Sequence, residues 1–271
     1  MRPIYLSHLT APESDPFASL RIAHETGYQG LGLRLADPAT GQPTSPLVND
    51  TALRRRFCAE LDALGLVVAE IEARVLEDGA SLSPQVFQAA ADLGAPDIIA
   101  VGPPSAPLQA LEERFAALCD AAAAFGLRMG FEPIAHRAGG TLSEALAIVA
   151  AGRATGARLV LDALHVDRMG VTPAEIAGLD SGLIAVFHLC DAPLRPADLA
   201  TQIDHSARNR WAPGDGVLPL RACLAALPPH LPLALEVPAA RLWGRVTPRA
   251  HAAHCLRRAR DLLSQTQIPT A

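Results

Sequence analysis

The sequence predicts an α/β fold, a single (β/α)8 TIM barrel that occupies residues 1–271 as one domain. Short apolar runs alternate along the chain with longer segments of helical period, and this order is typical of a parallel sheet. There are eight such runs. Dividing 271 residues by eight gives about 34 residues for each, the size of one strand and its return helix. No Gly/Ser-rich linker and no shift in composition marks a second domain.

The eight runs are rich in Val, Ile and Leu. Their hydrophobicity is nearly continuous, as expected of strands that are buried on both faces. In chain order they are IYLSHL (4–9), GLGLRL (30–35), LVVAEIEA (66–73), DIIAVG (97–102), RMGFEP (128–133), RLVLDA (158–163), LIAVFHLCDA (183–192) and LPLALEVP (231–238).

The helices between the runs have recognisable start signals. Four of them are predicted to begin with a capping side chain followed by a proline in the first helical position. These pairs are Asp15-Pro16, Ser83-Pro84, Thr172-Pro173 and Thr247-Pro248. The spacing Thr141 to Glu144 and Thr172 to Glu175 also matches a capping box. Helical period covers 107–125 and 248–263, and the arginine clusters at 54–56 and 257–260 are expected on solvated helix faces.

An open, doubly wound sheet is the alternative to a closed barrel. Such sheets often bind a dinucleotide through a GxGxxG turn after the first strand. No GxGxxG follows the first run here, so the sequence favours the barrel.

Composition excludes several classes of function. Half of the residues are hydrophobic and 19% are charged, which is typical of a globular chain with a large core. The formal net charge of −5 speaks against a nucleic-acid partner, because such proteins usually present a basic face. The chain has 23 arginines and no lysine. Schiff-base aldolases, lysine-anchored pyridoxal phosphate enzymes and P-loop nucleotidases each need a lysine amine, so all three are excluded.

The cysteines and the hydropathy pattern predict a cytoplasmic protein with no membrane partner. Five cysteines without a CxxC pair indicate neither a disulfide framework nor a thiolate zinc site. The first ten residues, MRPIYLSHLT, lack the apolar stretch of a signal peptide. No run approaches the roughly 18 apolar residues that a membrane-spanning helix needs.

Four successive runs each end in an ionisable residue, namely Glu132, Asp162, His188 and Glu236. In a barrel, the carboxyl ends of the strands meet at one mouth, where function gathers. One such residue alone is usually solvated, salt-bridged or part of the core. Three carboxylates together repel one another and need a cation. The sequence therefore predicts one divalent metal ion, Mn²⁺ foremost, with Mg²⁺, Co²⁺ and Zn²⁺ as alternatives.

Other polar residues near strand ends are candidates for binding a substrate. Glu72 ends the third run and could bind substrate hydroxyls or form an internal ion pair. Asp191 follows His188 by three residues and could orient it or cap a turn. The segment 193–216 is rich in Pro and Gly and is predicted to be a long loop over the mouth, contributing Arg208 or Trp211 to the pocket.

The motifs FEP, LDALH, FHLCDA and LEVP resemble those of the xylose-isomerase-like TIM-barrel superfamily. That superfamily includes sugar phosphate isomerases and epimerases, inosose isomerases, dehydratases and AP endonucleases. The resemblance covers essentially the whole chain. It implies that Glu132, Asp162, His188 and Glu236 are metal ligands and that Glu132 and Glu236 are also the catalytic acid/base pair. It further implies that His165 contacts a substrate oxygen, that Arg208 lies in a loop that closes the site, and that the chain forms a homo-oligomer.

The predicted function is that of a metal-dependent isomerase or epimerase of a small keto-sugar or keto-polyol. One glutamate would remove the proton next to a carbonyl, giving an enediolate that the metal holds. The alternative is a dehydratase or lyase of a cyclic keto-acid or inosose. An AP endonuclease would need further histidine ligands, but the fourth run ends in Val101-Gly102-Pro103 and 215–217 reads Asp-Gly-Val. A non-catalytic homologue is disfavoured because all four candidate ligands are present.

Overall fold

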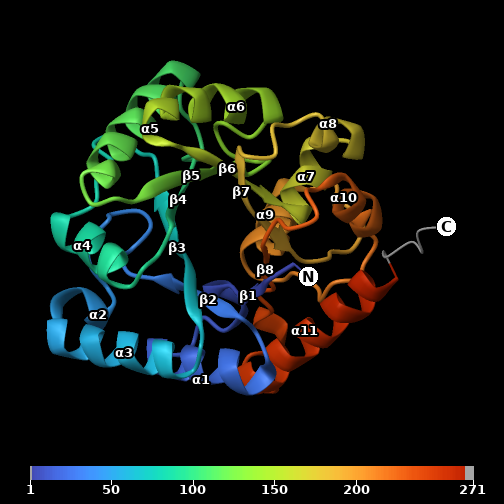
Figure 1. The fold of residues 1–271 in the computed structure, drawn as a ribbon. Helices are drawn as coiled ribbons and strands as arrows, with labels where there is room; N and C mark the ends of the chain where they lie inside the picture. Colours follow the sequence, from blue (N-terminus) through green and yellow to red (C-terminus); the bar gives the residue numbers. More distant parts are fainter. Residues whose placement is uncertain (1, 266–271) are drawn as a thin grey trace. The chain divides into compact units, whose positions relative to one another are not determined.

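The computed structural model describes residues 2–265. Its eight strands close into a barrel in chain order, β1 to β8, as labelled in Figure 1. Each predicted run coincides with one strand, β3 extending two residues beyond its run, so the predicted (β/α)8 fold is confirmed. The strands are β1 (Ile4–Leu6), β2 (Gly30–Arg34), β3 (Val67–Val75), β4 (Asp97–Val101), β5 (Arg128–Glu132), β6 (Arg158–Asp162), β7 (Ile184–Leu189) and β8 (Leu233–Leu235).

Helices follow the strands, as the alternating pattern predicts. The α-helices are α1 (Pro16–Thr26), α2 (Pro46–Asn49), α3 (Thr51–Ala63), α4 (Pro84–Asp92), α5 (Leu108–Ala123), α6 (Leu142–Ala151), α7 (Ala163–Met169), α8 (Pro173–Ala177), α9 (Leu199–Ala207), α10 (Leu220–Ala226) and α11 (Pro248–Ser264). Three short 3-10 helices are η1 (His8–Thr10), η2 (Arg153–Thr155) and η3 (Ala240–Leu242). Among residues 2–265, no helix is long and apolar enough to cross a bilayer.

The contacts divide the chain into two compact units, Met1–Tyr28 with Leu161–Ala271, and Gln29–Val160. The first unit contains β1, β7 and β8, and in it α11 packs along α1 and α10 packs against α8 (Figure 1). The second unit contains β2 to β5, and in it α5 packs along α6. That residues 1–271 form one domain stays a prediction.

Capping side chains begin most of the predicted helices. Asp15 accepts a hydrogen bond from the Ala18 amide at the start of α1, and Thr247 does the same for α11. Thr172 opens α8 with a complete capping box. Ser83 precedes α4 but makes no side-chain cap bond. These caps fix where each return helix leaves the loop before it, because they satisfy amides that have no partner inside the helix.

Two expectations about loops and helix faces were wrong. The segment 193–216 is not a structureless loop, because α9 occupies Leu199–Ala207 and begins at Asp198, whose carboxylate accepts from the Thr201 amide. Arg54 does not lie on a solvated face. Its guanidinium donates to the carbonyls of Leu47 and Val48, which α2 leaves open at its end, and it pairs with an aspartate of α4.

An ion cluster joins the starts of three neighbouring strands in the second unit. Asp97 opens β4, is buried, and pairs with Arg128 and Arg158, the first residues of β5 and β6. These are the amino ends of the strands, and residues at that end of a barrel serve stability more than catalysis. We therefore assign Asp97 to the fold.

Candidate metal centre

Asp162 is both the last residue of β6 and the N-cap of α7. Its Oδ1 atom accepts hydrogen bonds from the amides of Leu164 at 2.9 Å and His165 at 3.1 Å. The strand therefore enters the helix without a loop. These bonds fix the carboxylate and leave its Oδ2 atom to other partners.

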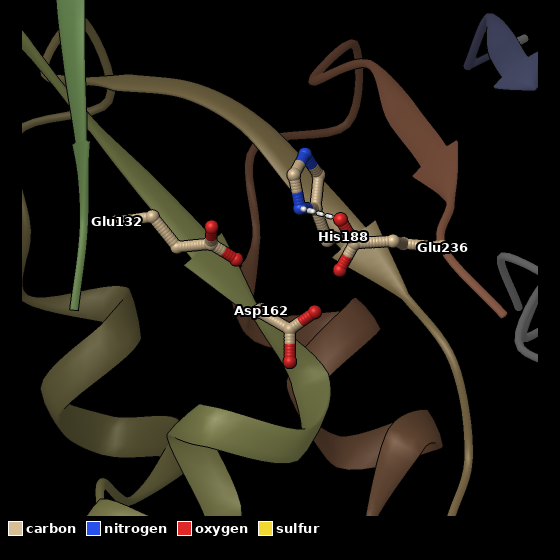
Figure 2. Close-up of side chains that lie close together, drawn as sticks. All are labelled: Glu132, Asp162, His188 and Glu236. Carbon is tan, nitrogen blue, oxygen red and sulfur yellow. Dashed lines mark ion pairs between the residues drawn. The ribbon is translucent and has the colours of Figure 1, made fainter. Parts of the chain in front are cut away.

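His188 and Glu236 come from neighbouring strands of the same unit. The register pairs His188 with Ala234 and Leu189 with Leu235. Glu236 is the residue directly after β8. The His188 Nδ1 atom lies 3.7 Å from Oε1 of Glu236, as the dashed line in Figure 2 marks. Both side chains are buried.

Arg210 supplies the positive charge for these carboxylates. Its Nη1 atom lies 2.5 Å from Oδ2 of Asp162 and 2.5 Å from Oε2 of Glu236. Its Nε atom donates to the Ser206 carbonyl at 2.9 Å, at the end of α9. Burial opposes the ionisation of Glu236, but Arg210, followed by His188, outweighs it and holds the pKa of this carboxyl well below its usual range. Glu236 is therefore ionised at neutral pH.

Glu132 is the last residue of β5, in register with Val101 of β4, and it is buried. Asp162, His188 and Glu236, all in the first unit, each offer one ligand atom, and these three atoms lie within 4.8 Å of one another (Figure 2). Carboxylate oxygens and an imidazole nitrogen suit Mn²⁺, Mg²⁺, Co²⁺ or Zn²⁺. The donor set fits the predicted metal, while the role of each residue stays a prediction.

The predicted substrate-binding residues lie in three different environments. His165 is buried on the first turn of α7, with Nε2 3.3 Å from the Ser206 hydroxyl. Glu72 is buried on β3, with Oε2 3.8 Å from Nη2 of Arg34. Arg208 is exposed, and its guanidinium lies 5.6 Å from the ring centre of Trp243. Their roles in substrate binding stay predictions.

Sequence reasoning selected Arg208 and missed Arg210. In a strand, residues two apart share a face. Arg208, however, is the C-cap residue that follows α9, with φ −140° and ψ −25°, so it is not extended; its side chain is exposed while that of Arg210 is buried. Isolated bridges pair Asn209 with Ala239 and Trp211 with Asp191, and they direct Arg210 inward. The N-cap at Asp198 was a signal that could have revealed α9.

Asp191 holds a loop through its carboxylate. Its two oxygens accept hydrogen bonds from the amides of Ala192, Gly214 and Leu218, at 2.8, 2.9 and 3.0 Å. A side chain at Gly216 would collide with this carboxylate. Asp191 thus fixes the turn that follows Arg210 and Trp211.

Comparison with known proteins identifies the family. The family model of the xylose isomerase-like TIM barrel matches residues 20–259. The chain belongs to this family. The resemblance inferred from the sequence is therefore confirmed. No curated protein matches the chain.

Solved structures show the same fold at low sequence identity. The crystal structure of the IolI protein with a bound zinc atom is 18% identical, with a TM-score of 0.80 and coverage of 97% of this chain and 99% of that chain. An L-ribulose 3-epimerase is 18% identical, with a TM-score of 0.69 and coverage of 98% and 96%. The probable 3-DHS dehydratase AsbF from Bacillus anthracis is 15% identical, with a TM-score of 0.71 and coverage of 94% and 98%.

Proposed function

We propose that this protein is a metal-dependent isomerase or epimerase of a small keto-sugar or keto-polyol. The observation that carries the proposal is the buried group of Asp162, His188 and Glu236, with Arg210 bridging the two carboxylates at 2.5 Å. Ionised carboxylates are rarely buried together unless cations compensate them, and such groups cluster at functional sites. The similarity to an L-ribulose 3-epimerase supports this class of substrate, and the similarity to the zinc-bound IolI protein supports a metal ion.

Glu132, Asp162, His188 and Glu236 would hold the metal ion. Each offers a hard oxygen or an imidazole nitrogen, and His188 and Glu236 already face each other at 3.7 Å. A divalent cation bound there would polarise the carbonyl of a hydroxyketone and acidify the neighbouring C–H bond.

The two glutamates would then move the proton. One carboxylate removes it from the carbon next to the carbonyl, and the other returns a proton from the opposite side. Glu236 is suited to begin as the base because Arg210 and His188 keep it ionised. His165 is suited to bind a substrate oxygen because the cap at Asp162 fixes the turn on which it stands.

The position to which the proton returns decides the reaction. Return to the same carbon from the other face gives an epimer, and return to the neighbouring carbon gives an aldose from a ketose. Loss of a β-hydroxyl group instead gives dehydration. The similarity to the probable dehydratase AsbF makes dehydration the second candidate.

The experiment is a solvent-exchange assay on a panel of ketoses and inososes with Mn²⁺ in D₂O, followed by NMR. We expect deuterium at the carbon next to the carbonyl of the substrate that turns over. Glu236→Gln keeps the shape and an oxygen ligand but removes the base, so kcat should fall by roughly 10²- to 10⁴-fold.

The controls separate the alternatives. Protein treated with a chelator should lose exchange and recover it when Mn²⁺ is returned. A labelled product that has lost water indicates the dehydratase. Turnover without solvent label, or full activity in Glu236→Gln, would overturn the proposed proton transfer.

A further inference from the structure

The backbone around Glu236 is held by a residue that lies far from it in the sequence. The β1 and β8 strands pair in parallel, with Leu6 opposite Leu235. The next rung would pair Ser7 with Glu236. In a parallel rung, a residue donates its N–H to the carbonyl before its partner and accepts from the amide after it.

Only half of that rung forms through the backbone. The Ser7 amide donates to the Leu235 carbonyl at 3.1 Å, as the rung requires. The Ser7 carbonyl, however, accepts from the Thr10 amide at 3.1 Å, because the chain turns into η1 at this point. The Val237 amide, which is fully buried and out of reach of water, finds a different acceptor.

The hydroxyl of Thr10 replaces the missing half. Its Oγ1 atom accepts from the Val237 amide at 2.8 Å and donates to the Leu235 carbonyl at 2.6 Å. One buried side chain thus binds the peptide groups on both sides of Glu236. A threonine hydroxyl can do this because it is both a donor and an acceptor.

The other contacts of this segment lie on different sides of it. The Glu236 amide donates to the Leu189 carbonyl of β7 at 3.3 Å. The next carbonyl, that of Val237, accepts from His251 Nε2 at 2.8 Å. Thr10 therefore holds the backbone just after the end of β8, on the side that faces β1. This is the stretch of backbone that sets the direction of the Glu236 side chain.

We infer that Thr10 is a positioning residue for Glu236, setting the carboxylate for metal binding and proton transfer. This inference rests on the proposed function, in which Glu236 is a ligand and the acid/base partner. Residues that orient metal ligands without touching the metal are expected to matter strongly, because losing them usually lowers metal affinity or activity by about 10- to 100-fold.

The experiment compares Thr10→Val with Thr10→Ser and Tyr28→Phe. Valine keeps the shape but loses the hydroxyl, while serine keeps the hydroxyl. Tyr28→Phe is the matched control because it removes another buried hydroxyl, which donates to the Ala252 carbonyl at 2.9 Å. Mn²⁺ binding is measured by isothermal titration calorimetry, and hydrogen exchange of the Val237 amide by NMR.

We expect Thr10→Val to bind Mn²⁺ about 10- to 100-fold more weakly and to expose the Val237 amide to faster exchange. Thr10→Ser should recover most of both, and Tyr28→Phe should change neither. If Thr10→Val does not fold, Thr10→Ala removes the same hydroxyl without the steric demand. Unchanged Mn²⁺ affinity in a folded variant that lacks the hydroxyl overturns the inference. No Mn²⁺ binding by the wild type would instead overturn the proposed function, and the exchange data would still report the hydrogen bond.

Discussion

Arg210→Met should destabilise the metal-free protein strongly. Arg210 places one nitrogen 2.5 Å from each of two buried carboxylates, so the substitution leaves both without their cation. Removing one partner of a buried ion pair costs about 3–5 kcal/mol. For a chain of this size, each kcal/mol lowers Tm by about 2–4 °C, so Tm should fall by about 6–20 °C.

The pH dependence of stability should also reverse. In the wild type, the folded-state pKa of Glu236 is depressed. The stability that its ionised carboxylate contributes is therefore present above the unfolded-state pKa and is lost as pH falls through the folded-state pKa. Without Arg210, burial dominates and should raise this pKa. The difference in stability between the wild type and the variant should then shrink as pH is lowered from 7 towards 5, because the Glu236 carboxyl of the variant becomes neutral.

The assay is thermal unfolding of chelator-treated protein between pH 5 and 8, with and without Mn²⁺. By mass action, Mn²⁺ at 100 times its Kd should stabilise any form that binds it, wild type or variant, by about 2.7 kcal/mol. Arg249→Met is the control, because Arg249 forms an exposed pair with Glu25 at 3.4 Å and should matter little. A Tm for Arg210→Met within about 2 °C of the wild type at pH 7 would refute the reasoning.

Three further predictions concern the fold. Gly102→Ala should destabilise the protein by at least about 3 kcal/mol in urea unfolding, because the added methyl would lie 1.8 Å from the Ala138 carbonyl oxygen. Its control, Gly178→Ala, meets only ordinary contacts at 3.5 Å, so its stability should stay within about 0.5 kcal/mol of the wild type. Asp97→Asn should cost about 1–3 kcal/mol by the same measurement, since both partner arginines reach water, and a neutral result would show that the cluster does not hold the strand starts. Burial lowers the pKa of His251, so wild-type stability should decline as pH falls below about 6.5, and His251→Gln should flatten that decline; parallel pH curves would contradict this.

Local signals in the sequence were sufficient to predict the strands and the candidate metal ligands. Continuous apolar runs identified all eight strands, and the ionisable residues near the ends of four runs include the group that the structure brings together. The last strand is shorter than its run, because the ladder stops once the Glu236 amide has bonded to β7, and Val237 binds the side chains of Thr10 and His251.

The environment of the site could not be read from the sequence. The choice between Arg208 and Arg210 depends on the residue at which α9 ends and on two isolated bridges. The contact of Thr10 with the peptides of Glu236 joins positions more than 220 residues apart. Such contacts depend on which backbone carbonyls accept hydrogen bonds within a turn, and the periodicity of the sequence does not show this.

The direct passage of β6 into α7 restricts how this protein can diverge. Asp162 is strand end, helix cap and candidate ligand at once, so one residue inserted after it would turn α7 by about 100° and break the cap. The segment from Leu194 to His205 is less restricted, because it contains most of α9 and precedes Ser206 and Arg210, which hold the buried carboxylates. Changes in substrate range should therefore accumulate in that segment, both in natural descendants and in engineered libraries, while the β6–α7 junction keeps its length.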